Sequence, residues 1–240
     1  MNLEQAKDQL IISYKIPRKK KSTFFWGPPG AGKSAMVYQT AAELKIGLID
    51  ERFSQMDPTD TKGLPHINEF NYTAYSIPGF LPRVDRDGEK GILFLDEFNT
   101  APQSVQAAGY QLILDGKLGD YVLPKGWMVV AAGNRAEDRA IAVRMSSALA
   151  NRFKNVDVVV DVDAWKKWAL NRGIDDSIIS FINWKNDRLH YMDTNETAWP
   201  SPRTWEDVHD HIPFLTNANE FNTVASLVSK GVAGEYLAHK

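Results

Sequence analysis

A glycine-rich segment after a short apolar run constrains this chain more than any other feature. The segment is Gly27-Pro28-Pro29-Gly30-Ala31-Gly32-Lys33-Ser34, and the run before it is Thr23-Phe24-Phe25-Trp26. It matches the pattern G-x-x-x-x-G-K-[ST] in the required context, with a strand predicted before it and a helix after it. Glycines let backbone N–H groups surround phosphate oxygens at the positive end of a helix. We therefore expect these eight residues to bind a nucleotide, with Lys33 on the β- and γ-phosphates and Ser34 on Mg²⁺.

Composition limits the remaining possibilities. The chain has 240 residues and a net charge of −2, so it can form an α/β domain with a smaller appendage but carries no general basic field for nucleic acid. It has no cysteine, which excludes disulfides and thiolate metal sites. No apolar run reaches membrane-spanning length, and the N-terminus lacks the features of a signal peptide. These observations predict a cytoplasmic protein without membrane contact.

Strand and helix patterns alternate over residues 1–160. Strands are predicted at 23–26, 46–50, 91–95, 128–132 and 156–160, and helices at 3–13, 33–45, 102–115 and about 140–151. Buried-type strands that alternate with helices are typical of a parallel sheet with helices on both faces. The predicted fold is therefore a three-layer α/β/α nucleotide-binding core.

Two segments interrupt this alternation. Residues 54–83 are rich in Pro, Gly, Asp and Asn, which indicates a functional loop or insertion, and residues 116–126 are predicted to form a hairpin. Asp57 and Asp60 in the first segment are interpreted as turn formers rather than metal ligands. The five histidines show no metal-ligand spacing.

Residues 161–240 show helical patterns alone. Four helices are expected, and Ser201-Pro202 provides an N-cap and a first-turn proline for the third of them. The five tryptophans of this region are predicted to form its core: Trp165, Trp168, Trp184, Trp199 and Trp205. We expect a small helical lid over 161–240.

Polar residues end two of the predicted strands. Asp96 and Glu97 follow Ile92-Leu93-Phe94-Leu95, and Asn134 follows Val129-Val130-Ala131-Ala132-Gly133. Ligands of open α/β sheets bind at the carboxyl ends of the strands. Asp96 is therefore expected to orient Mg²⁺, and Glu97 to polarise a water that attacks the γ-phosphate. Asn134 is a candidate for holding that water, with a simple turn-forming role as the alternative.

The order of these motifs resembles that of the AAA+ ATPases over essentially the entire chain. Within them the sequence is most similar to the MoxR-type group, on Gly27-Pro28-Pro29-Gly30, on Leu95-Asp96-Glu97-Phe98-Asn99-Thr100-Ala101-Pro102 and on Ser201-Pro202-Arg203. The segment 54–65 also looks like that group's insertion near the second helix. The lid of about 80 residues is shorter than is usual for the group.

This resemblance implies further roles and partners. Asn134 would be sensor 1, Arg152 in Ala150-Asn151-Arg152-Phe153 the arginine finger of a neighbouring subunit, and Arg203 sensor 2. Arg144 competes with Arg152 for the finger role. The implied nucleotide is ATP, and the implied assembly is a ring, expected to be a hexamer, with a von Willebrand factor A-type protein among the candidate partners.

Three functions remain open at this point. The leading one is an ATP hydrolase that remodels a protein client. The second is a nucleic-acid-associated motor or helicase loader, which the net charge disfavours unless basic residues such as Lys62, Arg83, Lys117 and Lys125 line a pore. The third is a scaffold gated by ATP with negligible hydrolysis, which would not need Glu97, Asn134 and Arg152 together.

Overall fold

A computed structural model describes residues 1–16, 21–135, 138, 150–193 and 195–240. These residues divide into two compact units. The first contains Met1, Gln5–Gly27 and Lys33–Asp157, and the second contains Asn2–Glu4, Pro28–Gly32 and Val158–Lys240. Within the described ranges no helix is both long enough and apolar enough to cross a membrane.

A parallel sheet forms the centre of the first unit. Within the described residues it has five strands in the order β2-β5-β8-β1-β9, and all four pairings are parallel. The strands are β1 (Thr23–Trp26), β2 (Gly47–Arg52), β5 (Lys90–Asp96), β8 (Gly126–Gly133) and β9 (Lys154–Asp157). The predicted parallel sheet is confirmed, and its carboxyl ends meet at one edge.

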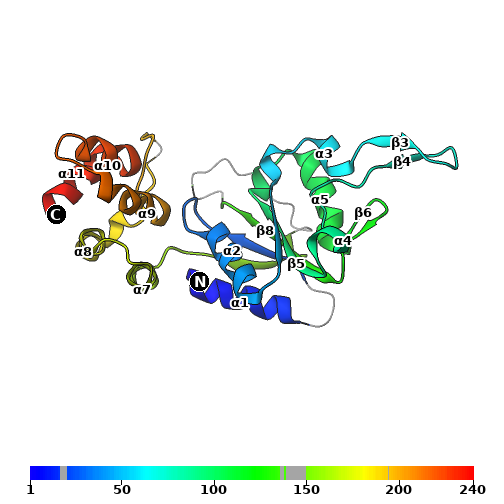
Figure 1. Cartoon of the computed structure of the whole chain (residues 1–240), viewed down its shortest axis with the longest axis horizontal. Helices are drawn as coiled ribbons and strands as arrows, with labels where there is room; N and C mark the ends of the chain where they lie inside the picture. The colour runs from blue at the N-terminus through cyan, green and yellow to red at the C-terminus, as the bar shows by residue number, and fades with distance from the viewer. Residues whose placement is uncertain (17–20, 136–137, 139–149, 194) are drawn as a thin grey trace. The chain divides into compact units, whose positions relative to one another are not determined.

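Helices cover both faces of this sheet (Figure 1). They are α1 (Leu3–Lys15), α2 (Lys33–Leu44) and α5 (Gln103–Asp115). Side chains alternate along a strand, so Leu93 and Val129 join Leu112 of α5 in one apolar cluster. On the other face α2 packs against β2 and β5 and buries Met36 and Val37. The three-layer arrangement predicted from the sequence is confirmed.

The predicted insertion at 54–83 contains regular structure. The elements here and just after it are η1 (Phe53–Gln55), α3 (Pro58–Lys62), β3 (Pro65–Ile67), β4 (Thr73–Tyr75) and α4 (Val84–Asp87). Strands β3 and β4 form an antiparallel hairpin. Asp57 and Asp60 form a capping box at the start of α3, in line with a local structural role. A 3-10 turn, η2 (Phe98–Thr100), follows β5, and the hairpin predicted at 116–126 is present as β6 (Lys117–Leu118) and β7 (Tyr121–Val122).

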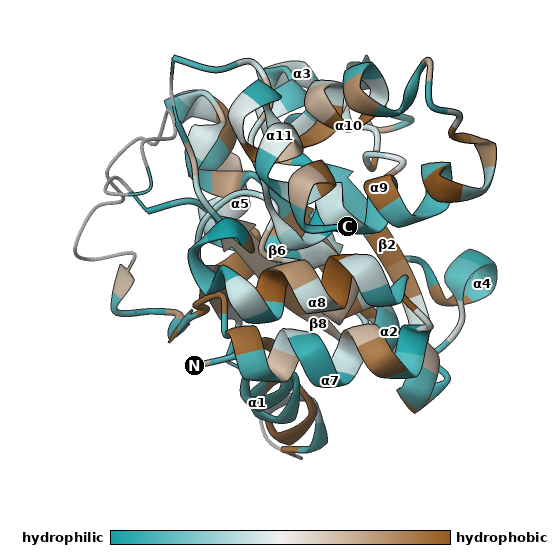
Figure 2. Ribbon diagram, turned by 90° about the vertical axis from the view of Figure 1, so that its left-hand side faces the viewer, coloured by the Kyte–Doolittle hydropathy of each residue, from teal (hydrophilic) through white to brown (hydrophobic). Residues whose placement is uncertain are grey.

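The second unit is helical after Val158. Its elements are α7 (Val162–Arg172), α8 (Asp176–Trp184), η4 (Asn186–Arg188), α9 (Pro202–His211), η5 (Ile212–Phe214), α10 (Glu220–Val228) and α11 (Lys230–His239). Hydrophobic and hydrophilic segments alternate along α7 and α8 (Figure 2), as expected for helices that bury one face. Phe181, Trp205 and Tyr236 are fully buried and pack ring against ring.

The structure corrects three expectations about the end of the chain. The last strand was predicted at 156–160 but spans Lys154–Asp157, because β1 pairs with it only as far as Trp26, where the chain turns into the glycine-rich loop. Trp184 was predicted to lie in the core but is 59% exposed and stacks on His239, whereas Trp165 and Trp205 are buried. Helix α11 was not predicted as a separate helix. The helix predicted at about 140–151 lies almost entirely outside the described residues.

Candidate nucleotide-binding site

Three neighbouring strands of the first unit bring the predicted polar residues to one edge of the sheet. Lys33 follows the loop after β1, Asp96 ends β5 and Glu97 follows it, and Asn134 follows β8. Because β8 lies between β5 and β1 in the sheet, Asn134 is located between the lysine and the two carboxylates. The strand order therefore brings together residues that lie far apart in the sequence.

Two glycines of the glycine-rich loop have positive φ values. Gly30 and Gly32 have φ values of +75° and +89°, which a residue with a Cβ adopts only with strain. The loop residues Pro28–Gly32 belong to the second unit, and a Cβ on Gly30 would lie 2.8 Å from Cβ and Oγ of Ser201. Also in that unit, His190 Nε2 lies 3.0 Å from the Pro29 carbonyl oxygen. Glycine is therefore required at position 30 both for its φ value and for the space it leaves.

Lys33 is the first residue of α2, and its side chain turns back toward Gly27. Its ammonium group donates to the Gly27 carbonyl oxygen at 2.7 Å and to Asn134 Oδ1 at 3.3 Å. The residue is only 7% exposed. A buried ammonium needs oxygen partners, and phosphate oxygens would supply the strongest ones.

Asp96 is held on both carboxylate oxygens. Ser34 Oγ donates to Oδ2 at 2.6 Å, and the Glu97 backbone N–H donates to Oδ1 at 2.8 Å. Hydroxyl and carboxylate oxygens are the hard ligands that Mg²⁺ prefers. Within the described ranges no group of three or more metal-ligating side chains exists. The donor set at Ser34 and Asp96 thus fits an ion that takes its other ligands from water and nucleotide phosphates, as Mg²⁺ commonly does.

Glu97 has an unusual backbone conformation. Its φ of +54° and ψ of +30° place it in the left-handed region, where a residue other than glycine is uncommon and strained. Its carboxylate accepts a hydrogen bond from Ser54 Oγ at 2.5 Å. Ser54 lies in η1, just after β2, so the neighbouring strand fixes the orientation of Glu97. The sequence reasoning did not identify Ser54, because no local pattern links it to a residue 43 positions away.

Asn99 is a second residue that the sequence reasoning missed as part of the site. Its side-chain amide is buried and donates to the Asn134 carbonyl oxygen at 2.7 Å. A Cβ on Gly133 would lie 2.0 Å from Asn99 Oδ1, so glycine at 133 leaves the space that the amide occupies. Asn99 therefore fixes the backbone from which the Asn134 side chain projects.

Asp50 of β2 is hydrogen-bonded to a tyrosine of α2. Asp50 accepts a hydrogen bond from the Tyr38 hydroxyl, and this bond, together with burial and the nearby charge, raises the pKa of Tyr38 to about 12. The charge of Asp96 contributes in the same direction. Asp50 and Asp96 therefore both place negative charge near the Tyr38 hydroxyl.

Two of the three candidate arginines, Arg152 and Arg203, lie within the described residues. Arg152 is exposed and precedes Phe153, whose ring is buried against Phe24 and Phe98. Arg203 is exposed and is the second residue of α9 in the helical unit. Arg144 lies outside the described residues.

Comparison with known proteins shows what this chain is similar to. Residues 22–153 match the family described as "AAA domain (dynein-related subfamily)". The chain is 25% identical over 191 residues to the replication factor C large subunit of Nanoarchaeum equitans, which covers 77% of this chain and 40% of that protein. It is 26% identical over 117 residues to the Holliday junction branch migration complex subunit RuvB of Streptococcus equi, which covers 47% of this chain and 29% of that protein. The matched part of the chain thus spans less than half the length of each of these relatives.

A solved structure shares the fold. The RuvB Holliday junction branch migration motor of Thermotoga maritima superimposes with a TM-score of 0.57 and covers 98% of this chain and 67% of that one. At 16% identity this likeness concerns the fold alone. In this chain that fold consists of the five-stranded parallel sheet with its flanking helices and of the C-terminal helices.

Proposed function

Because this chain belongs to the dynein-related subfamily of AAA domains, we propose that it binds ATP with Mg²⁺ and hydrolyses the γ-phosphate bond. The observation that carries the proposal is the set of contacts at one sheet edge. Ser34 donates a hydrogen bond to Asp96, Lys33 donates one to Asn134, and Glu97 directly follows Asp96 in the chain. These are the residue types that phosphoryl transfer requires, since its catalysis is mainly positioning and charge stabilisation.

Each residue has a defined task in this scheme. Residues 27–34 hold the phosphates, and Mg²⁺ held at Ser34 and Asp96 would neutralise charge on the β- and γ-phosphates. The oxygen of the attacking water bonds to the γ-phosphorus while Glu97 accepts a proton from that water. The bond between the γ-phosphorus and the β–γ bridging oxygen breaks. Asn134 orients the water, and Lys33 stabilises negative charge on the γ-phosphate oxygens.

A self-assembled ring, expected to be a hexamer, would complete the site. In this arrangement Arg152 reaches the γ-phosphate of the adjacent subunit, and Arg203 contacts the nucleotide from its own lid. The exposure of both arginines supports such roles. We also propose residues 1–160 as the nucleotide-binding domain and 161–240 as the lid, which is supported by the division between Asp157 and Val158.

The proposed task of this ring is to remodel a protein client, as in the MoxR-like group. We propose a protein with a von Willebrand factor A domain as a partner, because the resemblance to that group implies one. A second candidate is a nucleic-acid-associated motor. Sequence similarity to a replication factor C subunit and to a Holliday junction branch migration subunit favours it. ATPase stimulation by DNA that falls with added salt would support this second candidate over the first.

The ATPase rate per subunit, measured over a wide range of protein concentration, tests the proposal. We expect a steep rise with concentration, since a neighbour's Arg152 completes each site. The Arg152→Ala variant should lose about 10³–10⁵-fold in rate, whereas Arg172→Ala, at an exposed arginine of α7, should not. Mixing Arg152→Ala with Lys33→Ala should restore activity, because each chain supplies what the other lacks. A high rate that does not depend on concentration would contradict the role of Arg152 between subunits.

A further inference from the structure

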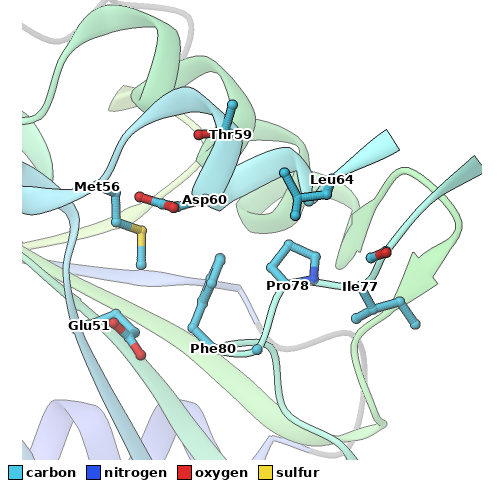
Figure 3. A pocket seen from close by; sticks show the side chains of 11 residues that line it. Glu51, Met56, Thr59, Asp60, Leu64, Ile77, Pro78 and Phe80 are labelled. Carbon is cyan, nitrogen blue, oxygen red and sulfur yellow. The ribbon is translucent and has the colours of Figure 1, made fainter. Parts of the chain in front are cut away.

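A groove lies beside the end of β2, between α3 and the chain that returns from the β3–β4 hairpin. It is a hollow of about 560 Å³. Figure 3 shows Glu51, Asp60 and Met56 toward one end of it, Leu64, Ile77 and Pro78 toward the other, and Phe80 between them. The groove therefore combines an apolar surface with two carboxylates.

The electrostatics of this groove favour a cation. Among the described residues, the charged side chains that line it are Glu51 and Asp60. Burial, with a smaller contribution from Asp50, raises the pKa of Glu51, so its negative charge is poorly solvated and a neighbouring cation would stabilise it. Over residues 50–80 the sequence has five acidic residues and two basic ones.

The hairpin extends the apolar surface of the groove into solvent. Ile67, Phe70 and Tyr72 are 73%, 67% and 67% exposed, and Leu64 and Ile77, at the base of the hairpin, are also exposed. The Phe70 and Tyr72 rings stack at a centroid distance of 6.4 Å. Several exposed large apolar side chains on one hairpin are typical of an interaction site.

Hydrogen bonds hold this surface in place. At the hairpin tip, Asn68 Oδ1 accepts from the backbone N–H groups of Phe70 and Tyr72, both at 3.0 Å. At the base, the Ser76 N–H donates to the Leu64 carbonyl oxygen at 2.9 Å. A surface that is ordered in advance loses less conformational entropy when it binds a partner.

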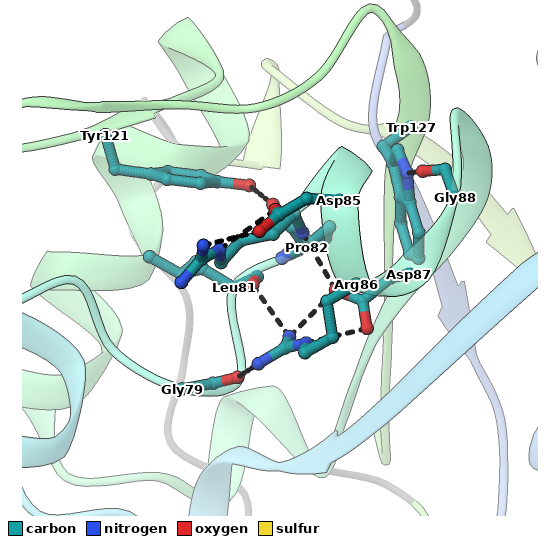
Figure 4. A network of polar contacts seen from close by, with 10 residues as sticks. Gly79, Leu81, Pro82, Asp85, Arg86, Asp87, Gly88, Tyr121 and Trp127 are labelled. Atoms are coloured by element: carbon teal, nitrogen blue, oxygen red, sulfur yellow. Dashed lines mark hydrogen bonds and ion pairs between the residues drawn. The ribbon is translucent and has the colours of Figure 1, made fainter.

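The chain that leaves the groove is also anchored. Arg86 donates to the Gly79 and Leu81 carbonyl oxygens at 2.8 and 3.1 Å, and the Tyr121 hydroxyl donates to the Pro82 carbonyl oxygen at 2.6 Å (Figure 4). These bonds connect the hairpin and its groove to the core near β7.

We propose that this groove and hairpin bind a polypeptide segment that carries lysine or arginine next to apolar side chains. The apolar side chains would pack on Ile77 and Phe70, and the cation would pair with Glu51. Nucleic acid is disfavoured because residues 64–77 contain no lysine or arginine to neutralise phosphates. This inference rests on the proposed remodelling of a protein client and assigns the surface that takes hold of it.

Fluorescence anisotropy with the full chain and no nucleotide tests the inference. The probe is a short fluorescein-labelled peptide of alternating leucine and lysine, and the reference probes are a leucine–glutamate peptide and a labelled oligo-dT. We expect the lysine peptide to bind and the two reference probes not to bind. Ile77→Ser should weaken binding about tenfold, and Glu51→Gln should weaken it and reduce its salt dependence. Leu170→Ser, at an exposed leucine of α7, should bind like the wild type.

Two results would overturn the inference. One is equal affinity of the wild type, Ile77→Ser and Glu51→Gln for the lysine peptide, with each variant shown to be folded by its unfolding transition. The other is binding of oligo-dT that weakens in Ile77→Ser. Because the assay contains no ATP, peptide binding that depends on the groove would stand even if the ring mechanism failed. Conversely, a concentration-dependent ATPase without such binding would remove this inference alone.

Discussion

The buried strand β5 and the β3–β4 hairpin carry similar apolar side chains in different surroundings. Leu93 and Phe94 of β5 are fully buried, whereas Ile67 and Phe70 of the hairpin are mostly exposed. Burial of such a side chain contributes about 1.5–3 kcal/mol to folding, and exposure contributes little. The apolar residues of β5 are therefore explained by the stability of the fold, but those of the hairpin are not. The exposed apolar side chains of the hairpin are explained better by contact with a binding partner, as proposed above.

The largest expected effect concerns the chemistry of the sheet edge. Glu97→Gln should lower ATP turnover by about 10²–10⁴-fold, because an amide cannot accept the proton of the attacking water. ATP affinity should be retained, since the glycine-rich loop is unchanged. Steady-state phosphate release and fluorescent-nucleotide binding measure the two quantities. Glu89→Gln, at an exposed glutamate, is the matched control; normal turnover in Glu97→Gln would remove Glu97 from the mechanism.

The next effect concerns the stability of the sheet. Phe94→Ala should lower the free energy of unfolding by about 3–5 kcal/mol, because it leaves a cavity beneath fully packed neighbours. Urea titration followed by tryptophan fluorescence measures this loss. A loss below about 1 kcal/mol would mean that the strand interior is packed no better than an ordinary surface site.

A smaller effect is expected at the residue that positions Asn134. Asn99→Ala should lower kcat about 10–100-fold, the range typical of residues that hold a site residue in position without touching the substrate. The ATP dissociation constant should stay close to that of the wild type, because Asn99 lies behind Asn134 and outside the phosphate-binding loop. Asn217→Ala, at an exposed asparagine, controls for the substitution itself. If affinity fell and kcat did not, Asn99 would have only a structural role.

A modest effect is expected where the hairpin region joins the core. Tyr121→Phe removes the buried bond to Pro82 and should cost about 1 kcal/mol of stability. Amide hydrogen exchange should then accelerate over 64–82 more than over β5. Equal acceleration in both regions would indicate that this bond supports the whole domain rather than the hairpin region.

The smallest effect is expected at the hairpin tip. Phe70→Ser should change the free energy of unfolding by no more than about 0.5 kcal/mol, as is usual for exposed positions. Measured beside Phe94→Ala under the same conditions, it compares a buried and an exposed phenylalanine directly. A large loss of stability at Phe70 would show that the hairpin packs against this chain, and the comparison above would fail.

Local patterns in the sequence predicted much of the fold. The strand, loop and helix at 23–44, the parallel sheet and the second hairpin follow from short-range periodicity and from glycine and proline positions. The sequence also indicated that Lys33, Ser34, Asp96, Glu97 and Asn134 share one edge, because carboxyl ends of parallel strands meet there. The structure brings these five side chains to that edge.

Long-range and context-dependent features were not predictable in this way. Ser54 and Asn99 contact Glu97 and Asn134 through tertiary packing, which no spacing rule encodes. Trp184 is a large apolar residue, yet it is 59% exposed and its ring stacks on His239 at the end of α11. The division between α10 and α11 depends on the φ of +80° at Ser229, a conformation that serine rarely adopts.

The strand order has a consequence for how this protein acquires its native state. β1 pairs with β8 in a register that joins Thr23 to Val130, and with β9 in one that joins Thr23 to Lys154. Contacts between residues this far apart in sequence slow folding, because a long loop must close before they form. A chain still emerging during synthesis therefore holds Lys33 and Asp96 without the strand that separates them. Nucleotide affinity should develop late and in a single step, so nascent chains stopped before β8 should not bind ATP.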